Sequence, residues 1–182
     1  WPLILASSPI RASDAGEWSQ SSFRPLPIPE LLSGEAKHDG LHFYLTAQHG
    51  ETAFYPDQPT ATMGLNGNYL GPTLRMHQHD QVHIHVKNDL NEATTLHWHG
   101  MDVPAEEDGG PYQVIAPGHD WTAHYTVKNE AATCWYHSHM MHQTGRQVYH
   151  GLAGVLIVDD EHHSDLPLPH DYGIDDIPLI LQ

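Results

Sequence analysis

Basic residues are scarce in this chain: its 182 residues hold 7 lysines and arginines against 23 aspartates and glutamates, a formal net charge of −16. With no basic patch to neutralise phosphates, the composition argues against a nucleic-acid partner. No apolar run reaches the roughly 18 residues that a membrane helix requires, so no membrane span is predicted. The one cysteine, Cys134, excludes a disulfide within the chain and says little about the compartment.

Helical periodicity is also lacking, since no segment shows it strongly over more than one or two turns. Short alternating segments separated by Gly, Pro, Asn and Asp predict β-strands instead, at residues 41–47, 74–77, 81–88, 96–99, 119–127, 133–137 and 154–158. The predicted fold is all-β, an antiparallel sandwich or barrel. Residues 66–69, Asn-Gly-Asn-Tyr, predict a turn, and the Ser- and Pro-rich residues 1–37 predict an extended lead-in.

Histidine is abundant, with 18 residues, and two pairs have the form His-X-His: His97 with His99, and His137 with His139. Residues i and i+2 of a strand lie on one face about 6.5 Å apart, so each pair presents two imidazoles side by side. Two such strands brought together surround one small volume with four rings. An unpaired buried polar group costs roughly 1–3 kcal/mol, and one set of metal ions would satisfy all four rings. Imidazole suits copper, zinc, iron and nickel.

Further motifs accompany these pairs in a fixed order. Together they make the sequence resemble the first domain of multicopper oxidases, and within that family the laccase-like bacterial copper efflux oxidases. The resemblance runs from about residue 26 to residue 182. It is carried by residues 26–32, 66–72, 94–100, 108–111, 131–139, 144–147, 151–154 and 173–178.

The resemblance implies a cupredoxin-like Greek-key barrel or sandwich and a division of the chain. Residues 1–37 are then a leader and lead-in, 38–160 the cupredoxin-like domain, and 161–182 the start of a linker to a second domain. The other cluster histidines and a "type 1" copper are expected from further domains of the same protein. Export to the periplasm through a signal peptide is likewise an expectation from the family.

The resemblance also implies roles for individual residues. His97 matches a ligand of the "type 2" copper, and His99, His137 and His139 match ligands of the "type 3" pair. In the family, dioxygen is reduced to water at this cluster with electrons from Cu(I) or phenolic reductants. Asp108 matches an aspartate that helps to deliver protons.

Several alternatives stay open. The four histidines suit a structural zinc site or hydrogen-bonded core rings as well. Asp108, and Asp102 at a nearby acidic position of the family, are also suited to capping turns or orienting ligand rings. A stand-alone copper-binding or sequestration module without oxidase activity is the alternative function.

A second group of histidines departs from the family pattern: His77, His79, His83 and His85. His83 and His85 share the strand face opposite Val82, and we expect them to face solvent. An exposed polar strand face and an auxiliary site for Cu(II) or Zn(II) are both compatible with this pattern.

The residues that flank the paired histidines have simpler interpretations. Trp98, Trp135 and Tyr136 are expected to pack in the core and exclude water from the site. Cys134 is expected to be a buried thiol or a disulfide partner for another domain. Arg146 is expected to stabilise its loop.

Overall fold

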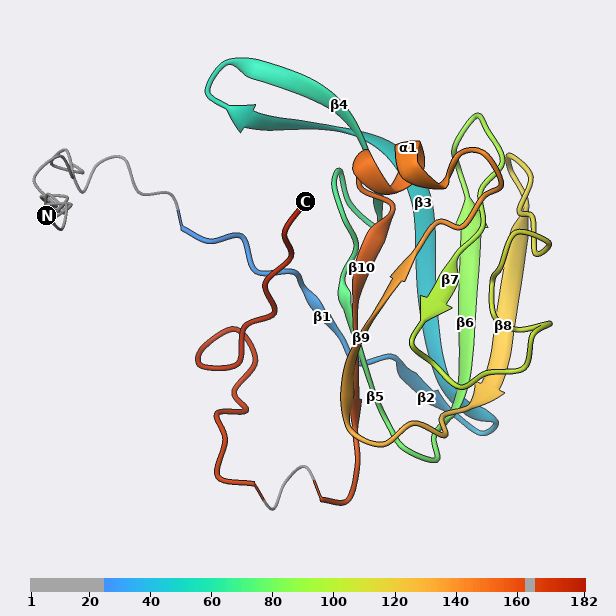
Figure 1. Cartoon of the computed structure of the whole chain (residues 1–182), viewed down its shortest axis with the longest axis vertical. Coiled ribbons are helices and arrows are strands. Elements are labelled where there is room, and N and C mark those ends of the chain that lie inside the picture. The colour runs from blue at the N-terminus through green and yellow to red at the C-terminus, as the bar shows by residue number, and fades with distance from the viewer. Residues whose placement is uncertain (1–24, 163–165) are drawn as a thin grey trace, which may run out of the picture.

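The computed structural model describes residues 25–162 and 166–182, and over these ranges it contains two β-sheets and one short helix (Figure 1). The predicted leader lies mostly outside them. The elements in chain order are β1 (Leu31–Leu32), β2 (Glu35–Lys37), β3 (Gly40–Tyr55), β4 (Gln58–Leu65), β5 (Thr73–His77), β6 (Gln81–Asn88), β7 (His97–His99), β8 (Asp120–Thr126), β9 (Ala132–His137), α1 (Thr144–Tyr149) and β10 (Ala153–Asp159).

The first sheet has the order β1-β5-β10-β9-β7, and the second has the order β2-β3-β6-β8 with β4 paired to β3. The prediction of an all-β fold is confirmed. The prediction of purely antiparallel sheets is wrong, because β1 and β10 run parallel to β5, and β3 runs parallel to β6. Parallel neighbours need a crossover connection, and a crossover leaves no local signal in a sequence of short strands.

A long hairpin formed by β3 and β4 extends beyond the sheets (Figure 1). The sequence pattern predicted only residues 41–47 of β3 and no strand at β4. The reason is burial: past Ala47 the side chains of β3 are exposed or half-buried, so the alternation of apolar and polar residues fades. Asp57 makes the turn with a φ of 60°.

The core lies between the two sheets and follows the two-residue period of the strands. Val82, Ile84 and Val86 on β6 are at most 1% exposed, and so are Phe43 and Leu45 on the neighbouring strand β3. Large side chains of the first sheet meet them from the other side; the fully buried ones include Leu74, Met76, Trp98, Tyr136 and Leu156. Burying one such side chain stabilises the fold by about 1.5–3 kcal/mol.

Tyr136 links the core to the strand that carries His137. Its ring lies so close to Gly154 on β10 that a Cβ there would lie 2.3 Å from the phenolic oxygen. The hydroxyl donates a hydrogen bond to the carbonyl oxygen of Pro72 at 2.6 Å. These contacts fix β9 against its neighbours.

Over the described ranges, no helix is long and apolar enough to cross a bilayer.

Candidate metal centre

The two histidine pairs meet because β7 and β9 are neighbours in the first sheet. The antiparallel register sets His97 opposite His137 and Trp98 opposite Tyr136. Trp98 and Tyr136 are fully buried in the core. Alternation along the strands therefore places the histidines on the other face of the sheet, away from the core.

Three of the four rings form a compact group. One ring nitrogen from each of His97, His99 and His137 lies within 4.8 Å of the other two. Nδ1 of His99 lies 3.2 Å from Nε2 of His137. His139, just beyond the end of β9, has its ring centre 5.3 Å from that of His97 and 5.9 Å from that of His137. The structure thus brings all four predicted residues together, with His139 at the edge of the group.

Backbone carbonyls orient two of these rings. Nδ1 of His97 donates to the carbonyl oxygen of Asp108 at 2.9 Å, and Nδ1 of His137 donates to that of Ser138 at 2.7 Å. With the proton on Nδ1, each ring keeps its Nε2 lone pair for a metal ion. The backbone N–H of His139 donates to the hydroxyl of Thr95 at 2.9 Å, which holds that residue beside the group.

Asp108 lies in a loop that is packed against β7. Its carboxylate oxygen Oδ1 is 3.2 Å from Nδ1 of His97, and about a third of its side chain is exposed. The next residue, Gly109, has a φ of +68°, and a Cβ there would lie 1.6 Å from the carbonyl oxygen of Leu96. Glycine is therefore required for the loop to approach β7 and bring Asp108 to His97.

The other acidic position, Asp102, has a different environment. Its side chain is 70% exposed, and its carboxylate lies 3.9 Å from Nζ of Lys128. Of these two carboxylates, that of Asp108, about a third exposed, is the one that lies beside the histidine group.

A buried amide supports the segment between the two histidines of the second pair. The side-chain oxygen of Gln147 accepts hydrogen bonds from the hydroxyls of Ser138 at 2.6 Å and Thr94 at 2.9 Å. Its amide nitrogen donates to the carbonyl oxygen of Ala93 at 2.9 Å. Sequence reasoning gave Gln147 no role of its own, although it lies in one of the family motifs. Only the tertiary contact between α1 and the ends of β7 and β9 reveals this role.

The predicted packing residues separate into two kinds. Trp98 and Tyr136 are core residues, as expected, whereas Trp135 is 38% exposed and stacks on the ring of His137 at 3.9 Å between centres. Cys134 is a half-buried free thiol whose pKa is raised by burial. Arg146 pairs with Glu92, which is consistent with a role in stabilising the loop.

Burial favours the neutral form of His137. Desolvation lowers the pKa of His137 from 6.5 to about 4. Repulsion from the three other rings adds to this shift, and the hydrogen bond to the carbonyl of Ser138 opposes it. A neutral imidazole is the form that binds metals. Three imidazole nitrogens within 4.8 Å of one another, with the ring of His139 beside them, are a donor set that suits copper ions.

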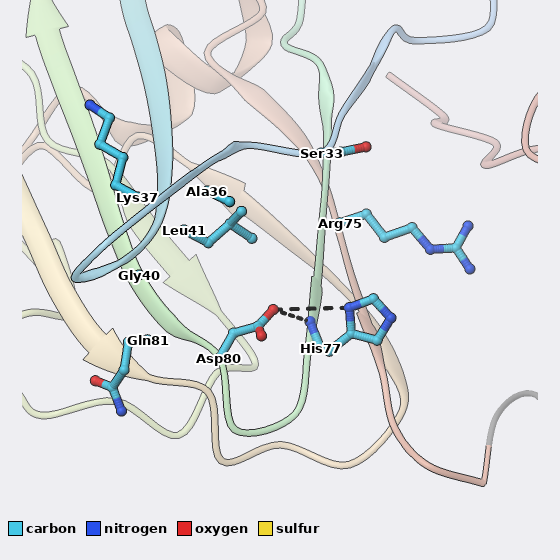
Figure 2. A pocket seen from close by; sticks show the side chains of 9 residues that line it. All are labelled: Ser33, Ala36, Lys37, Gly40, Leu41, Arg75, His77, Asp80 and Gln81. Atoms are coloured by element: carbon cyan, nitrogen blue, oxygen red, sulfur yellow. Dashed lines mark hydrogen bonds and ion pairs between the residues drawn. The ribbon is translucent and has the colours of Figure 1, made fainter.

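The second group of predicted histidines is divided by the structure. His77 and His79 flank the turn before β6 and are exposed. His77 lines a pocket of about 430 Å³, in which Asp80 points toward His77 and accepts its backbone N–H at 2.7 Å (Figure 2). Within the described ranges, neither joins a group of three metal-donor side chains.

His83 and His85 lie on the face opposite Val82, as predicted. The expectation that they face solvent is wrong, because both are half-buried. His83 stacks on His42 at 4.4 Å between ring centres, and His85 stacks on Tyr44 at 4.6 Å. Neighbouring strands supply rings at the same register, and these rings cover one another.

Comparison with known proteins agrees with this geometry. The family model "Multicopper oxidase" matches residues 46–163. The chain belongs to the multicopper oxidase family. The multicopper oxidase mco of Staphylococcus aureus is 44% identical over 158 residues, which are 86% of this chain and 35% of that protein. Cell division protein FtsP of Escherichia coli K12 is 37% identical over 180 residues, 99% of this chain and 37% of that protein.

Solved structures confirm the cupredoxin-like fold and the laccase-like relationship. A laccase from Pediococcus acidilactici superposes with a TM-score of 0.81 at 38% identity, over 85% of this chain and 34% of that one. The laccase-like multicopper oxidase CueO from Ochrobactrum sp. gives a TM-score of 0.80 at 41% identity, again over 85% and 34%. The chain therefore spans about a third of the length of these relatives.

Proposed function

We propose that this chain is the part of a multicopper oxidase that supplies His97, His99, His137 and His139 to a trinuclear copper cluster. The observation that carries the proposal is the meeting of three of these donors within 4.8 Å, with His139 beside them, on neighbouring strands. Residues 38–160 form the cupredoxin-like domain in this proposal, and residues 161–182 begin the connection to further domains, which supply the other cluster ligands and a type 1 copper.

When bound, such copper ions supply the redox chemistry that takes dioxygen to water with four electrons from Cu(I) or a phenolic reductant. The contribution of this chain is positional. His97 and His137 present Nε2 lone pairs because backbone carbonyls occupy their Nδ1 protons. Trp135 covers one face of the His137 ring and excludes water from it. The assignment of His97 to the type 2 ion and of the other three histidines to the type 3 pair belongs to the proposal.

Asp108 is the residue that we assign to proton delivery. Its carboxylate is partly exposed and lies beside His97, so it can take a proton from solvent and release it within the site. An asparagine at this position keeps an oxygen acceptor for His97 but carries no transferable proton. Asp108→Asn in the intact enzyme should therefore lower oxygen turnover while the copper content stays normal. Unchanged turnover at normal copper loading would mean that Asp108 only orients the ring.

The main proposal is tested by copper analysis of the intact enzyme together with oxidation of Cu(I) and of 2,6-dimethoxyphenol. We expect His137→Gln to lose cluster copper and both activities. The matched control is His119→Gln, because His119 is exposed and its ring bonds only to the carbonyl of Pro117 among the described contacts. Retention of full copper and activity in His137→Gln would refute the proposal. Export to the periplasm is part of the same proposal and is checked by fractionating cells.

Two other functions are separated by the same assays. A sequestration module binds copper but consumes no oxygen with either reductant. A role in cell division is suggested by the likeness to FtsP, which extends over 99% of this chain. It predicts that loss of the intact protein impairs cell division.

A further inference from the structure

A second cluster of imidazoles lies on the other sheet, apart from β7 and β9. The register of β3, β6 and β8 aligns His42 with His83 and His83 with His124 across three neighbouring strands. The adjacent row on the same face contains His85, two residues along β6. The second sheet thus carries a ladder of histidine rings on the face away from the core.

Asp39 brings a carboxylate to the end of this ladder. Its Oδ1 lies 3.0 Å from Nε2 of His42, and its Oδ2 lies 3.8 Å from Nε2 of His83. One donor atom from each of Asp39, His42 and His83 lies within 4.8 Å of the other two. The two rings are nearly parallel, with an interplanar angle of 6°. Nε2 of each ring faces the Asp39 carboxylate, but Nε2 of His83 also donates to the backbone carbonyl oxygen of Asp39 at 3.2 Å, so His83 must exchange that bond for the ion and tilt away from the stack.

Outer partners hold the central ring in place. Nδ1 of His42 is 2.9 Å from Nε2 of His85, and Nδ1 of His85 is 2.9 Å from the hydroxyl of Thr122. When Nε2 of His42 binds a metal ion, its Nδ1–H donates to His85, whose own Nδ1–H donates to Thr122. Metal-binding histidines need this kind of acceptor behind them, because it fixes the tautomer and the ring orientation.

Burial and access are also suitable for an ion. The side chain of His42 is 8% exposed and that of His83 17% exposed, so both donors are preorganised by their neighbours. The side chain of Asp39 is 43% exposed, which leaves a path from solvent to the carboxylate. The chain's net charge of −16 favours the approach of any cation.

We propose that Asp39, His42 and His83 form a second metal site, distinct from the copper centre, for a divalent first-row transition ion. Two imidazoles and one carboxylate are a donor set for Zn(II) and Cu(II), and Cu(II) binds such a set more tightly in the general affinity order. The hard cations Mg(II) and Ca(II) prefer oxygen ligands and are excluded by the two nitrogen donors.

The test uses Zn(II) as the probe, because it has no redox chemistry. Zinc bound per chain is measured by equilibrium dialysis at micromolar free Zn(II), in the wild type and in variants whose folding is checked by circular dichroism. His42→Gln and His83→Gln should each bind one zinc ion fewer than the wild type. His49→Gln is the control, because His49 lies on the same strand, is exposed and bonds to Asn91. It should bind the same amount of zinc as the wild type.

Asp39→Asn tests the same site without changing a strand residue, since Asp39 precedes β3. It should weaken zinc binding at this site by more than about tenfold, because even outer-shell partners of metal ligands change affinity by 10–100-fold. In crystals grown with ZnCl2, an anomalous peak at the zinc edge should lie within bonding distance of His42 and His83. Equal zinc binding by the wild type, His83→Gln and Asp39→Asn would overturn the proposal and leave the ladder as a stacked strand surface.

Discussion

Replacing the buried amide of Gln147 by leucine tests how the loop that carries His139 is held. The side chain of Gln147 is fully buried, and leucine has a similar volume, so the change removes hydrogen bonds without opening a large cavity. The hydroxyl of Ser138 loses its acceptor, although its oxygen still accepts the backbone N–H of Met140 at 3.3 Å, and the carbonyl of Ala93 loses the amide donor. Thr94 keeps a second acceptor, the carbonyl of Thr95 at 3.2 Å.

Each buried hydrogen-bonding group left without its partner costs about 1–3 kcal/mol, so the two groups together should lower the free energy of unfolding by about 2–6 kcal/mol. A loss of about 3 kcal/mol corresponds to a fall in Tm of about 6–12 °C for a chain of this size. Thermal unfolding followed by circular dichroism measures the change. Copper content at the histidine centre should fall as well, because Ser138 lies between His137 and His139.

The matched control is Gln58→Leu, an exposed glutamine at the start of β4. It should change stability by less than about 0.5 kcal/mol. If Gln147→Leu unfolds at the same temperature as Gln58→Leu, the hydrogen bonds of Gln147 do not hold the loop, and the argument about its role is refuted.

Three further predictions concern single groups. Tyr125→Phe should be neutral or stabilising by up to about 1 kcal/mol, since the buried hydroxyl of Tyr125 has no hydrogen-bond partner among the described residues. Tyr136→Phe should lower the free energy of unfolding by about 1–2 kcal/mol, because the hydroxyl of Tyr136 donates to the carbonyl oxygen of Pro72. Chemical denaturation compares the two, and equal losses would contradict this. Gly109→Ala should lower stability by more than about 2 kcal/mol through its clash with a carbonyl, and Gly118→Ala, with a φ of +75° but open space around it, should cost less in the same assay. Finally, burial lowers the pKa of His137 from 6.5 to about 4, so between these values the unfolded chain binds a proton that the folded chain does not. The metal-free chain should therefore lose up to about 3 kcal/mol as the pH falls from 6.5 to 4. Urea titrations across this pH range should show a smaller loss of stability for His137→Gln than for the wild type. An equal loss would show that groups other than His137 cause the pH dependence.

Local patterns in the sequence were enough to predict the strand that carries His97 and His99 and the strand that ends at His137, with His139 just beyond it. A spacing of two residues puts His97 and His99 on one face whatever the topology, and the same holds for the strand that leads to His137. The alternation of Val82, Ile84 and Val86 likewise placed β6 correctly, because half of its side chains are buried and half are not.

The features that were missed depend on contacts between distant parts of the chain. The ring of His42 meets that of His83 only because β3 pairs with β6 in parallel at one register, and no pattern within either strand specifies that register. The role of Gln147 depends on where α1 packs. The β4 hairpin was missed because its burial does not alternate: the first four residues of β4 are exposed and the last four, Thr62–Leu65, are all buried. The sequence thus predicted which histidines come together but not the groups that orient them.

The central claim is that four histidines of this chain hold copper, and crystallography of the intact enzyme loaded with copper tests it most directly. Anomalous scattering at the copper edge should reveal ions bonded to His97, His99, His137 and His139. Copper elsewhere in the molecule, with these four rings bonded only to protein groups, would contradict it.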